Sequence, residues 1–561
     1  MKFPPVTGFL TSQIGYDLRS PMRALYRAPK RDALPENGRF QLKDLATNDI
    51  VLEQPLNYWG ECWQSHWWIA DFSSLAQAGE YCIIIKTDGE SSITSDSFAV
   101  DEYLLWKETI HTVAIDQFEG RAEIARFGKG WQDCGAQYRE VGSTTGALFG
   151  LLDLLNIGFQ WLKPDYKMRL AQQVIHGCDY LVSCQQRAAD LGFPAGAIIH
   201  EMPNGLKTIP QDQGQSVVAL AHASRQIYEI DSGRSMDYLN RAAAAYEYYT
   251  QQCQPGKLPH FSAMLHGAPT DYQPTSFMSG DLLMMIWGGL ELATSGRLEY
   301  LEESVRAARE LLNRQVAKGA EGELYGHFYA FADCMFTEKA FIHHHVGHDT
   351  SMMFNHYIVP LIKLRQQLSE HPDAPRWQQA IHDFAYGYFL PACQSNPFYL
   401  LPQGEYGDEG VLTFAGPWHG MNVCYGYAAS LAIQLEEYFD DPQFRQIAVG
   451  NLQWIAGLNT GFTKDSFVGC VMWRDDIAEG TAVSYSQIHG IGRRAVQAWT
   501  KIPGSIGNGF CTNIQFQMKV EPTKANDGPW RYSDEDWIPH AGGWVSGLTY
   551  LRQIMGWTVL D

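Results

Sequence analysis

Two acidic residues stand in settings that suit acid–base chemistry. Asp133 lies in residues 130–136, which read GWQDCGA, and Glu535 lies in residues 530–537, which read WRYSDEDW. Two carboxyl groups about 6.5–9.5 Å apart can hydrolyse a glycosidic bond with inversion, one protonating the leaving oxygen and the other activating water. Asp534 and Asp536 flank Glu535, and like-charge repulsion would raise its proton affinity, as a general acid requires. The same pattern also fits a solvated loop.

Helices are the elements that would position these acids. Hydrophobic periodicity predicts about 12 helical segments, over residues 101–126, 144–160, 165–187, 211–228, 234–253, 277–296, 298–314, 347–368, 374–393, 418–439, 441–457 and 541–555. Connections that leave the even-numbered segments are short and those that leave the odd-numbered ones are long, so the long loops share one face. The even segments are apolar and the odd ones amphipathic, which predicts inner and outer helices.

The predicted fold is therefore mainly α, an (α/α)6 barrel over residues 101–561 preceded by a small β domain over residues 1–100. Short strands separated by turn residues predict an immunoglobulin-like β-sandwich for the β domain, with strands at Arg23–Tyr26, Arg39–Leu42, Trp67–Phe72, Tyr81–Lys86 and Ser97–Val100. No Pro/Gly/Ser-rich linker separates the parts, so we expect them to pack closely. Asp133 and Glu535 each precede an inner helix, where loops on a rigid scaffold tend to carry function.

Charge and composition restrict the partners. The 561 residues carry a formal net charge of −20, which repels polyphosphate and argues against a nucleic acid or an anionic membrane. The N-terminal residues lack the apolar run of a secretory signal, and no stretch approaches the roughly 20 apolar residues that span a bilayer. We therefore expect a cytoplasmic protein that acts on a small oligosaccharide, and the sequence does not indicate its oligomeric state.

No motif indicates a cofactor or a metal. The 11 cysteines follow irregular spacings without a C-x-x-C pair, which predicts reduced thiols. The histidines His343, His344, His345 and His348 have some metal-site character, but residues lining a polar cleft explain them equally well. The glycines of residues 490–492 and 504–509 do not follow a strand as a nucleotide loop would.

Several segments, in order along the whole chain, carry a family resemblance. Residues 12–16 (SQIGY), 70–75 (ADFSSL) and 78–81 (AGEY) resemble the immunoglobulin-like module that precedes many catalytic domains of glycoside hydrolase family nine. Residues 130–136 are similar to that family's Gly-Trp-Tyr-Asp-Ala-Gly-Asp. Glu535 with residues 541–544 (AGGW) resembles its Asn-Glu and Asn-Ala-Gly-Phe, and residues 454–459 with 466–469 resemble its penultimate segment.

The resemblance implies an inverting β-glycosidase with Glu535 as the acid. The family's second Asp, usually regarded as the base, falls on Ala136, which leaves Asp133 as the only carboxylate of that motif to hold the water. The departures resemble the family's exo-acting branch from chitin-degrading bacteria. This branch removes β-linked glucosamine from the non-reducing end of short chito-oligosaccharides, and the nearest alternative is a β-1,4-glucanase or cellodextrinase.

Candidate substrate-binding residues lie in the long loops. Acidic side chains could pair with a sugar ammonium, and aromatic ones could stack on apolar sugar faces, although surface charges and buried aromatic residues give the same pattern. The acidic candidates are Asp408, Glu409, Glu201 and either Asp534 or Asp536; the remaining ones are Trp418, His419, Trp530, Tyr532 and Trp537.

Two further function classes stay open. A polysaccharide lyase on the same barrel would use Tyr or His to abstract a proton from a uronate, but the net charge of −20 disfavours an anionic substrate. A catalytically silent oligosaccharide-binding protein is the other, motivated by Ala136. Reducing ends, unsaturated ends or no products would distinguish the three.

Overall fold

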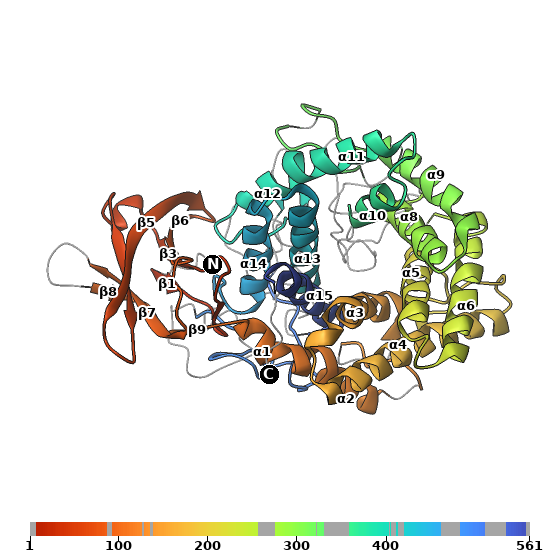
Figure 1. Ribbon diagram of the computed structural model, residues 1–561, viewed down its shortest axis with the longest axis horizontal. Coiled ribbons are helices and arrows are strands. Elements are labelled where there is room, and N and C mark those ends of the chain that lie inside the picture. Colours follow the sequence, from red (N-terminus) through yellow and green to blue (C-terminus); the bar gives the residue numbers. More distant parts are fainter. Residues whose placement is uncertain are drawn as a thin grey trace.

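An N-terminal β domain lies beside a ring of helices (Figure 1). This computed structural model describes residues 7–86, 92–125, 128–134, 139–255, 275–320, 322–329, 332, 358–402, 404–405, 411–412, 420–461, 483–510 and 535–556.

The β domain is a curled sheet whose two halves enclose a core. Its strands are β1 (Gly8–Leu10), β2 (Tyr16–Asp17), β3 (Arg23–Ala28), β4 (Arg39–Asp44), β5 (Ile50–Cys62), β6 (Ser65–Asp71), β7 (Gly79–Lys86), β8 (Ser92–Thr94) and β9 (Phe98–Asp101), paired in the order β1-β3-β6-β5-β4-β7-β9-β2, with β8 on β7. The first part of β5 pairs with β4 and the rest pairs with β6. Tyr26 and Trp68 from one half pack with Phe40, Ile83 and Phe98 from the other, as in a sandwich.

The five expected strands are all present, and β5 is the long strand that the sequence did not reveal. Most of its side chains are exposed or half-buried, so the strand shows no regular alternation of apolar and polar residues. The immunoglobulin type of the sandwich stays a prediction.

The helices form the expected barrel. Within the described residues, the inner helices are α3 (Val141–Asp153), α5 (Pro210–Gln226), α8 (Ser279–Thr294), α10 (Val359–Gln367), α13 (Asn422–Phe439) and α15 (Pro539–Ile554). Each contacts the next, and α15 contacts α3, which closes the ring. The outer layer holds α1 (Leu104–His111), α2 (Gln117–Ile124), α4 (Pro164–Asp190), α6 (Ser232–Gln251), α9 (Leu301–Leu312), α11 (Ala374–His382), α12 (Leu390–Gln394) and α14 (Gln443–Ile455).

Burial explains which helices are inner. Every residue of α8 from Ser279 to Ala293 is buried, whereas α9 buries only one side and exposes Glu302 and Arg306. Inner helices also approach one another closely: a Cβ added at Gly150 of α3 would lie 2.0 Å from the carbonyl oxygen of Gly542 on α15. The backbones of α3 and α15 are therefore in direct contact.

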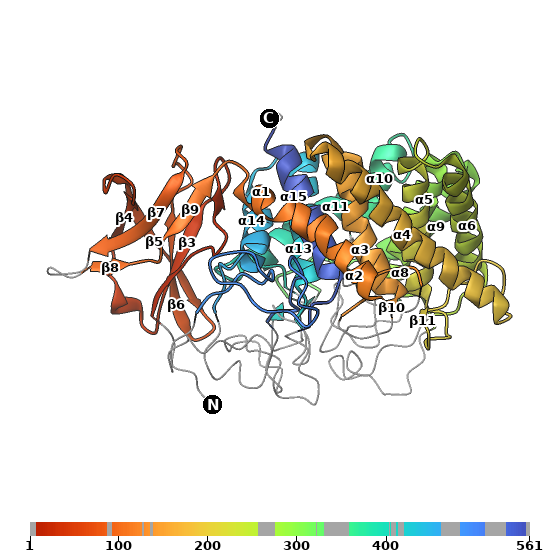
Figure 2. The same cartoon turned by 90° about the horizontal axis from the view of Figure 1, so that it is seen from below.

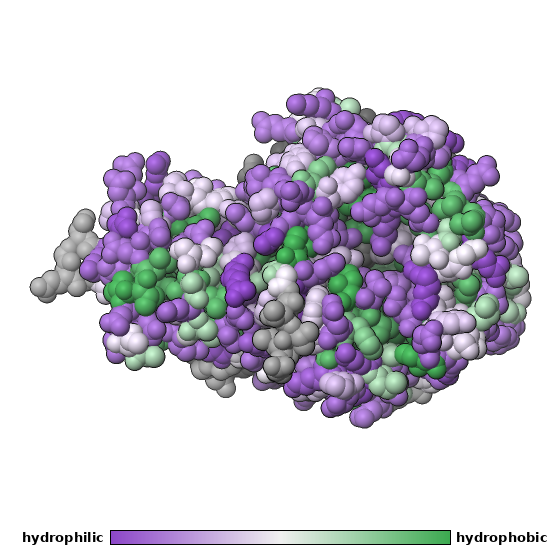
Figure 3. Space-filling view, in the orientation of Figure 1, coloured by the Kyte–Doolittle hydropathy of each residue, from purple (hydrophilic) through white to green (hydrophobic). Residues whose placement is uncertain are grey.

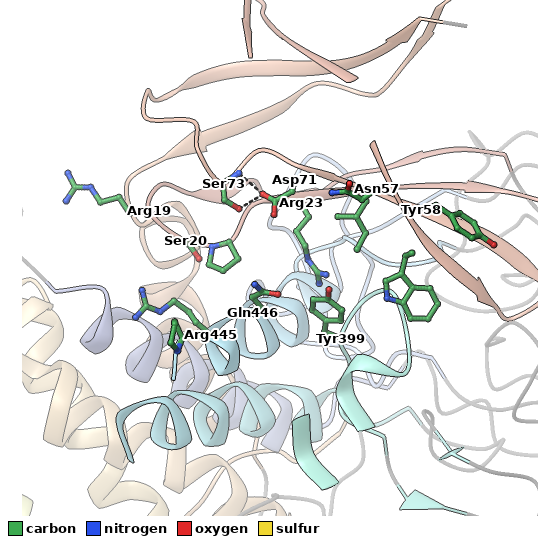
Figure 4. Close-up of a pocket in the computed structure, with 14 residues that line it drawn as sticks. Arg19, Ser20, Arg23, Asn57, Tyr58, Asp71, Ser73, Tyr399, Arg445 and Gln446 are labelled. Carbon is green, nitrogen blue, oxygen red and sulfur yellow. Dashed lines mark hydrogen bonds between the residues drawn. The ribbon is translucent and has the colours of Figure 1, made fainter. Parts of the chain in front are cut away.

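The β domain packs directly on the barrel, as expected from the missing linker. Arg23 of β3 donates to the carbonyl oxygen of Phe398 at 3.2 Å, and its guanidinium lies 3.8 Å from the ring centre of Tyr399. A cavity of about 710 Å³ lies along this junction, where Arg23 and Asp71 of the β domain face Tyr399, Arg445 and Gln446 of the barrel (Figure 4). Neither Asp133 nor Glu535 lines it.

The barrel has two distinct ends. The short strands β10 (Arg139–Glu140) and β11 (Glu201–Met202) lie at one end, and the C-terminal end of α15 lies at the other (Figure 2). Hydrophilic side chains predominate on the face seen in Figure 3, where hydrophobic ones form small separate groups. Among the described residues, no helix is both long and apolar enough to cross a membrane.

Candidate active site

Asp133 and Glu535 come together at the N-terminal ends of two neighbouring inner helices. Asp133 precedes β10 and α3, and Glu535 precedes α15, which contacts α3. The backbone N–H of Ile538 donates to the carbonyl oxygen of Asp133 at 3.1 Å, which ties the two loops to each other. Both side chains are buried, with 1% of Asp133 and 5% of Glu535 exposed. Burying a carboxyl group costs free energy of folding. Two buried carboxyl groups on adjacent loops therefore indicate a candidate functional site.

Arg121 of α2 anchors both loops. Its guanidinium donates to the carbonyl oxygens of Gln132 at 3.1 Å, Asp133 at 2.9 Å and Asp536 at 2.5 Å. It also forms an ion pair with the Asp536 carboxylate at 3.0 Å, and both side chains are fully buried. The expectation that Asp536 repels Glu535 or binds an ammonium group is therefore wrong, because Arg121 neutralises this carboxylate.

The Asp133 carboxyl group has two different oxygens. Oδ2 lies 3.0 Å from the hydroxyl oxygen of Ser143 and accepts from the backbone N–H of Glu140 at 3.4 Å. Oδ1 is buried and has no hydrogen-bond partner among the described residues. Burial raises the pKa of Asp133 well above its usual value, and the charges of Glu140 and Glu535 raise it further, outweighing the two hydrogen bonds. A carboxyl group with a raised pKa stays protonated to higher pH, so Asp133 can act as a general base only above that pKa.

A chain of hydrogen bonds holds the carboxyl group of Glu535. The backbone N–H of Val423 donates to Nδ1 of His540 at 2.9 Å, so the ring proton of the neutral tautomer is on Nε2. This nitrogen lies 2.6 Å from Oδ1 of Asn508, whose amide nitrogen donates to Oε2 of Glu535 at 2.9 Å. The backbone N–H of Asn508 donates to the carbonyl oxygen of Glu535 at 2.8 Å. The orientation of Glu535 is thus set by α13 and α15.

Ser143 and Trp537 connect the two acidic loops. The indole N–H of Trp537 donates to the Ser143 hydroxyl oxygen at 2.7 Å, and this oxygen also lies 3.0 Å from Oε2 of Glu140. Trp537 is buried, with 4% exposed. Its N–H group is therefore engaged within the protein, and stacking of its ring on a sugar stays a prediction.

A cluster of acidic residues adjoins Asp133 through Glu140, which shares the Ser143 hydroxyl with it. Glu140 and Glu201 are opposite each other in the β10–β11 pair, and their carboxyl oxygens and a nitrogen of His200 lie within 4.8 Å of one another. Nδ1 of His200 is 2.8 Å from Oδ2 of Asp212. Burial lowers the pKa of His200, but the carboxylates of Asp212 and Glu140 outweigh it and raise this pKa to about 9. Glu201, an expected substrate-binding residue, thus lies beside Glu140, and its role stays a prediction.

The remaining expected residues are not placed. Asp408, Glu409, Trp418, His419, Trp530, Tyr532 and Asp534 lie outside the described residues, as do Ala136 and the histidines of residues 343–348. Sequence reasoning missed Glu140, Ser143, His200, Asn508 and His540. Only Glu140 carried a signal, since it is an acid seven residues after Asp133 in the same loop.

The arrangement suits hydrolysis by an acid and a base. One buried carboxyl group on each of two adjacent loops could protonate a leaving oxygen and take a proton from water, respectively. Asp133 offers Oδ1 for the water, and the network around Glu535 fixes its direction. Neither group needs a cofactor for proton transfer.

Solved structures share the fold of this chain, but comparisons of its sequence with known proteins find no match. No family model matches the chain, and no curated protein is significantly similar to it. A metagenome-derived glycoside hydrolase family 9 endoglucanase is similar in structure, with a TM-score of 0.66 and 15% identity over 97% of this chain and 99% of that one.

Two other solved structures agree. A thermostable endoglucanase from Alicyclobacillus acidocaldarius, solved as a single mutant, has a TM-score of 0.62 and 13% identity over 97% of this chain and 99% of its own. A structure described as AaCel9A in complex with cellobiose-like isofagomine has a TM-score of 0.62 and 14% identity over the same shares. At such low identity the similarity establishes the shared fold, which extends over both the β domain and the barrel.

Proposed function

We propose that this chain is an inverting glycoside hydrolase of family nine that cleaves β-1,4-linked glucose oligosaccharides. The observation that carries the proposal is the buried pair Asp133 and Glu535 at the N-terminal ends of α3 and α15. The fold shared with solved family 9 endoglucanases along 97% of the chain supports it. The sequence resemblance around residues 130–136 and 535–544 supports it independently.

Glu535 is assigned as the general acid and Asp133 as the general base. The hydrogen bonds from Asn508 hold Glu535 in one orientation, which a proton donor to the leaving oxygen requires. Asp133 has an oxygen, Oδ1, with no hydrogen-bond partner among the described residues, so it can hold the water molecule that is deprotonated. Its raised pKa means that it does so only once it has lost its own proton. Ala136 leaves Asp133 as the carboxylate of its motif, so the base role falls on this residue.

The glucose substrate is chosen because the structural neighbours are endoglucanases, and one is in complex with a cellobiose-like compound. A second candidate is the exo-β-glucosaminidase reading of the sequence. One observation favours it: Glu140, Glu201 and Asp212 place three carboxyl groups around His200, and Glu140 shares the Ser143 hydroxyl with Asp133. A surplus of negative charge would attract a sugar ammonium.

The test compares cellotetraose with chitosan tetraose, the glucosamine tetramer, at matched pH. Cleavage of cellotetraose with the formation of new reducing ends supports the proposed glucanase activity. Faster cleavage of the glucosamine tetramer would instead identify the protein as a glucosaminidase. Unsaturated ends would instead identify a lyase. Binding of either tetramer without products would identify the silent oligosaccharide-binding protein that Ala136 suggests.

Two variants test the assigned residues. Glu535→Gln and Asp133→Asn should each lower the rate by about 10²–10⁴-fold, because each removes one group that transfers a proton. Asp153→Asn is the matched control, since Asp153 carries a half-buried carboxyl group at the opposite end of α3, where it accepts a hydrogen bond from Ser546. Near-native turnover in Asp133→Asn would move the base to another residue.

A further inference from the structure

The hydroxyl of Ser143 lies between two carboxyl groups. Its oxygen is 3.0 Å from Oδ2 of Asp133 and 3.0 Å from Oε2 of Glu140, and it accepts the indole N–H of Trp537 at 2.7 Å. A hydroxyl has one proton to donate and two lone pairs to accept with. Ser143 can therefore donate to only one carboxylate. For the other 3.0 Å contact to be a hydrogen bond, that carboxyl group must itself carry a proton and donate it to Ser143.

The surroundings decide which carboxyl group carries this proton. Nε2 of His200 lies 3.9 Å from Oε1 of Glu140, and its Nδ1 is hydrogen-bonded to Asp212. With a pKa of about 9, His200 is a cation at neutral pH and stabilises Glu140 as an anion. This arrangement leaves the proton on Asp133.

Asp133 has no comparable cation at its carboxyl group among the described residues. Glu140 and Glu535 both act on it as negative charges. Arg121 reaches its backbone carbonyl and is paired with Asp536, while Glu201 lies beside Glu140 and His200. The Glu140 anion on β10 therefore favours the protonated form of Asp133. Glu535, in the loop before α15, does the same while it is ionised, but not in the protonated form that its role as the acid requires.

We propose that Glu140 is a positioning residue that replaces the carboxylate missing at residue 136: through Ser143 it shares a proton with Asp133 and sets the pH at which Asp133 can deprotonate water. The inference rests on the proposed base role of Asp133. The anion at Glu140 makes Asp133 a stronger base than an isolated aspartate, and water deprotonation by Asp133 begins only above the pH at which the shared proton is lost. Glu140 itself does not touch the substrate in this role.

The first experiment is the pH profile of kcat/KM for Glu140→Gln on the preferred tetramer. Removal of the negative charge should shift the acidic limb to lower pH by about one unit, a shift of the size that a nearby charge produces. Asp153→Asn, which alters a half-buried carboxyl group of the same helix far from Ser143, should leave the limb in place. An unshifted limb, or a shift to higher pH, would overturn the proposal.

A second measurement does not need any activity. A carboxyl group with a raised folded-state pKa costs stability as pH rises from about 4 through that folded value, because only the unfolded chain has then released the proton. Asp133→Asn should therefore raise the thermal midpoint more at pH 8 than at pH 4. The same substitution in a Glu140→Gln background should give a smaller gain, because part of the repulsion is already gone.

Equal gains in both backgrounds would show that Glu140 and Asp133 do not interact, and would overturn the proposal. This stability cycle gives its answer even if neither tetramer is hydrolysed. In that case the proposed function is wrong, but the stability measurements still show whether Glu140 and Asp133 interact.

Discussion

Replacing Arg121 with Met should destabilise the protein strongly, because Arg121 is the buried cation that anchors both acidic loops. Its ion pair with Asp536 has no exposure on either side chain. Removing one member of a buried pair leaves an uncompensated charge and costs about 3–5 kcal/mol. The barrel has about 460 residues at roughly 2.1 cal/mol/K of unfolding entropy each, or about 1 kcal/mol/K, so we expect the thermal midpoint to fall by roughly 3–5 °C.

Arg169→Met is the matched control. Arg169 pairs with Asp116 at 2.5 Å and with Glu119 of α2 at 2.6 Å, but 32% of its side chain is exposed. Partly exposed pairs contribute about 0–1 kcal/mol each, so the midpoint should fall by about 2 °C or less. Differential scanning calorimetry measures both. If Arg121→Met lowers the thermal midpoint no more than Arg169→Met does, Arg121 does not stabilise the two acidic loops through a buried ion pair.

A double variant separates stability from function. Arg121→Met with Asp536→Leu removes both charges, and replacing a buried ion pair by apolar side chains is often neutral. We expect the thermal midpoint to recover but the activity to stay low, because the hydrogen bonds to the carbonyl oxygens of Gln132 and Asp133 are still missing. If the thermal midpoint and the activity both recover, Arg121 affects activity only because it stabilises the fold.

Three more substitutions test other parts of the account. Asn508→Ala should lower kcat by about 10–150-fold, the equivalent of a hydrogen bond of about 1.5–3 kcal/mol to the proposed acid; steady-state kinetics that match the wild type would remove Asn508 from the site. Gly150→Ala should lower the urea midpoint, because its Cβ would lie 2.0 Å from the carbonyl oxygen of Gly542, whereas Gly233→Ala should be tolerated, because its Cβ would lie 3.5 Å from Oδ1 of Asp231; similar midpoints would argue against the close helix contact. Burial raises the pKa of Asp153 to about 6, so Asp153→Asn should add stability that grows from pH 4 to pH 6 and reaches about 3 kcal/mol; a gain that is independent of pH would refute this.

The sequence was sufficient for the layout of the barrel. The apolar composition of residues 277–293 and the charged face of residues 298–314 separated inner from outer helices, and the ring of contacts confirms this assignment. Alternation also located five strands of the β domain. β5 was missed because most of its side chains are exposed to some degree, so neither face repeats a hydrophobic pattern.

The partners of the candidate site were beyond sequence reasoning. Asp536 looked like a charge that would act on Glu535, but its partner Arg121 is 415 residues away in the chain. Ser143 and Asn508 are ordinary polar residues whose importance comes from what the closed ring brings next to them. Periodicity predicts which face of a helix is buried, but it does not predict which distant loops share a buried proton.

The central claim is that Glu535 and Asp133 hydrolyse a β-glycosidic bond by inversion. The most direct test is proton NMR of the first product from cellotetraose or the glucosamine tetramer, before mutarotation, with wild type, Glu535→Gln and Asp133→Asn. We expect the wild type to form the α-anomer first and each variant to be slower by about 10²–10⁴-fold. First formation of the β-anomer, or near-native rates in both variants, would contradict it.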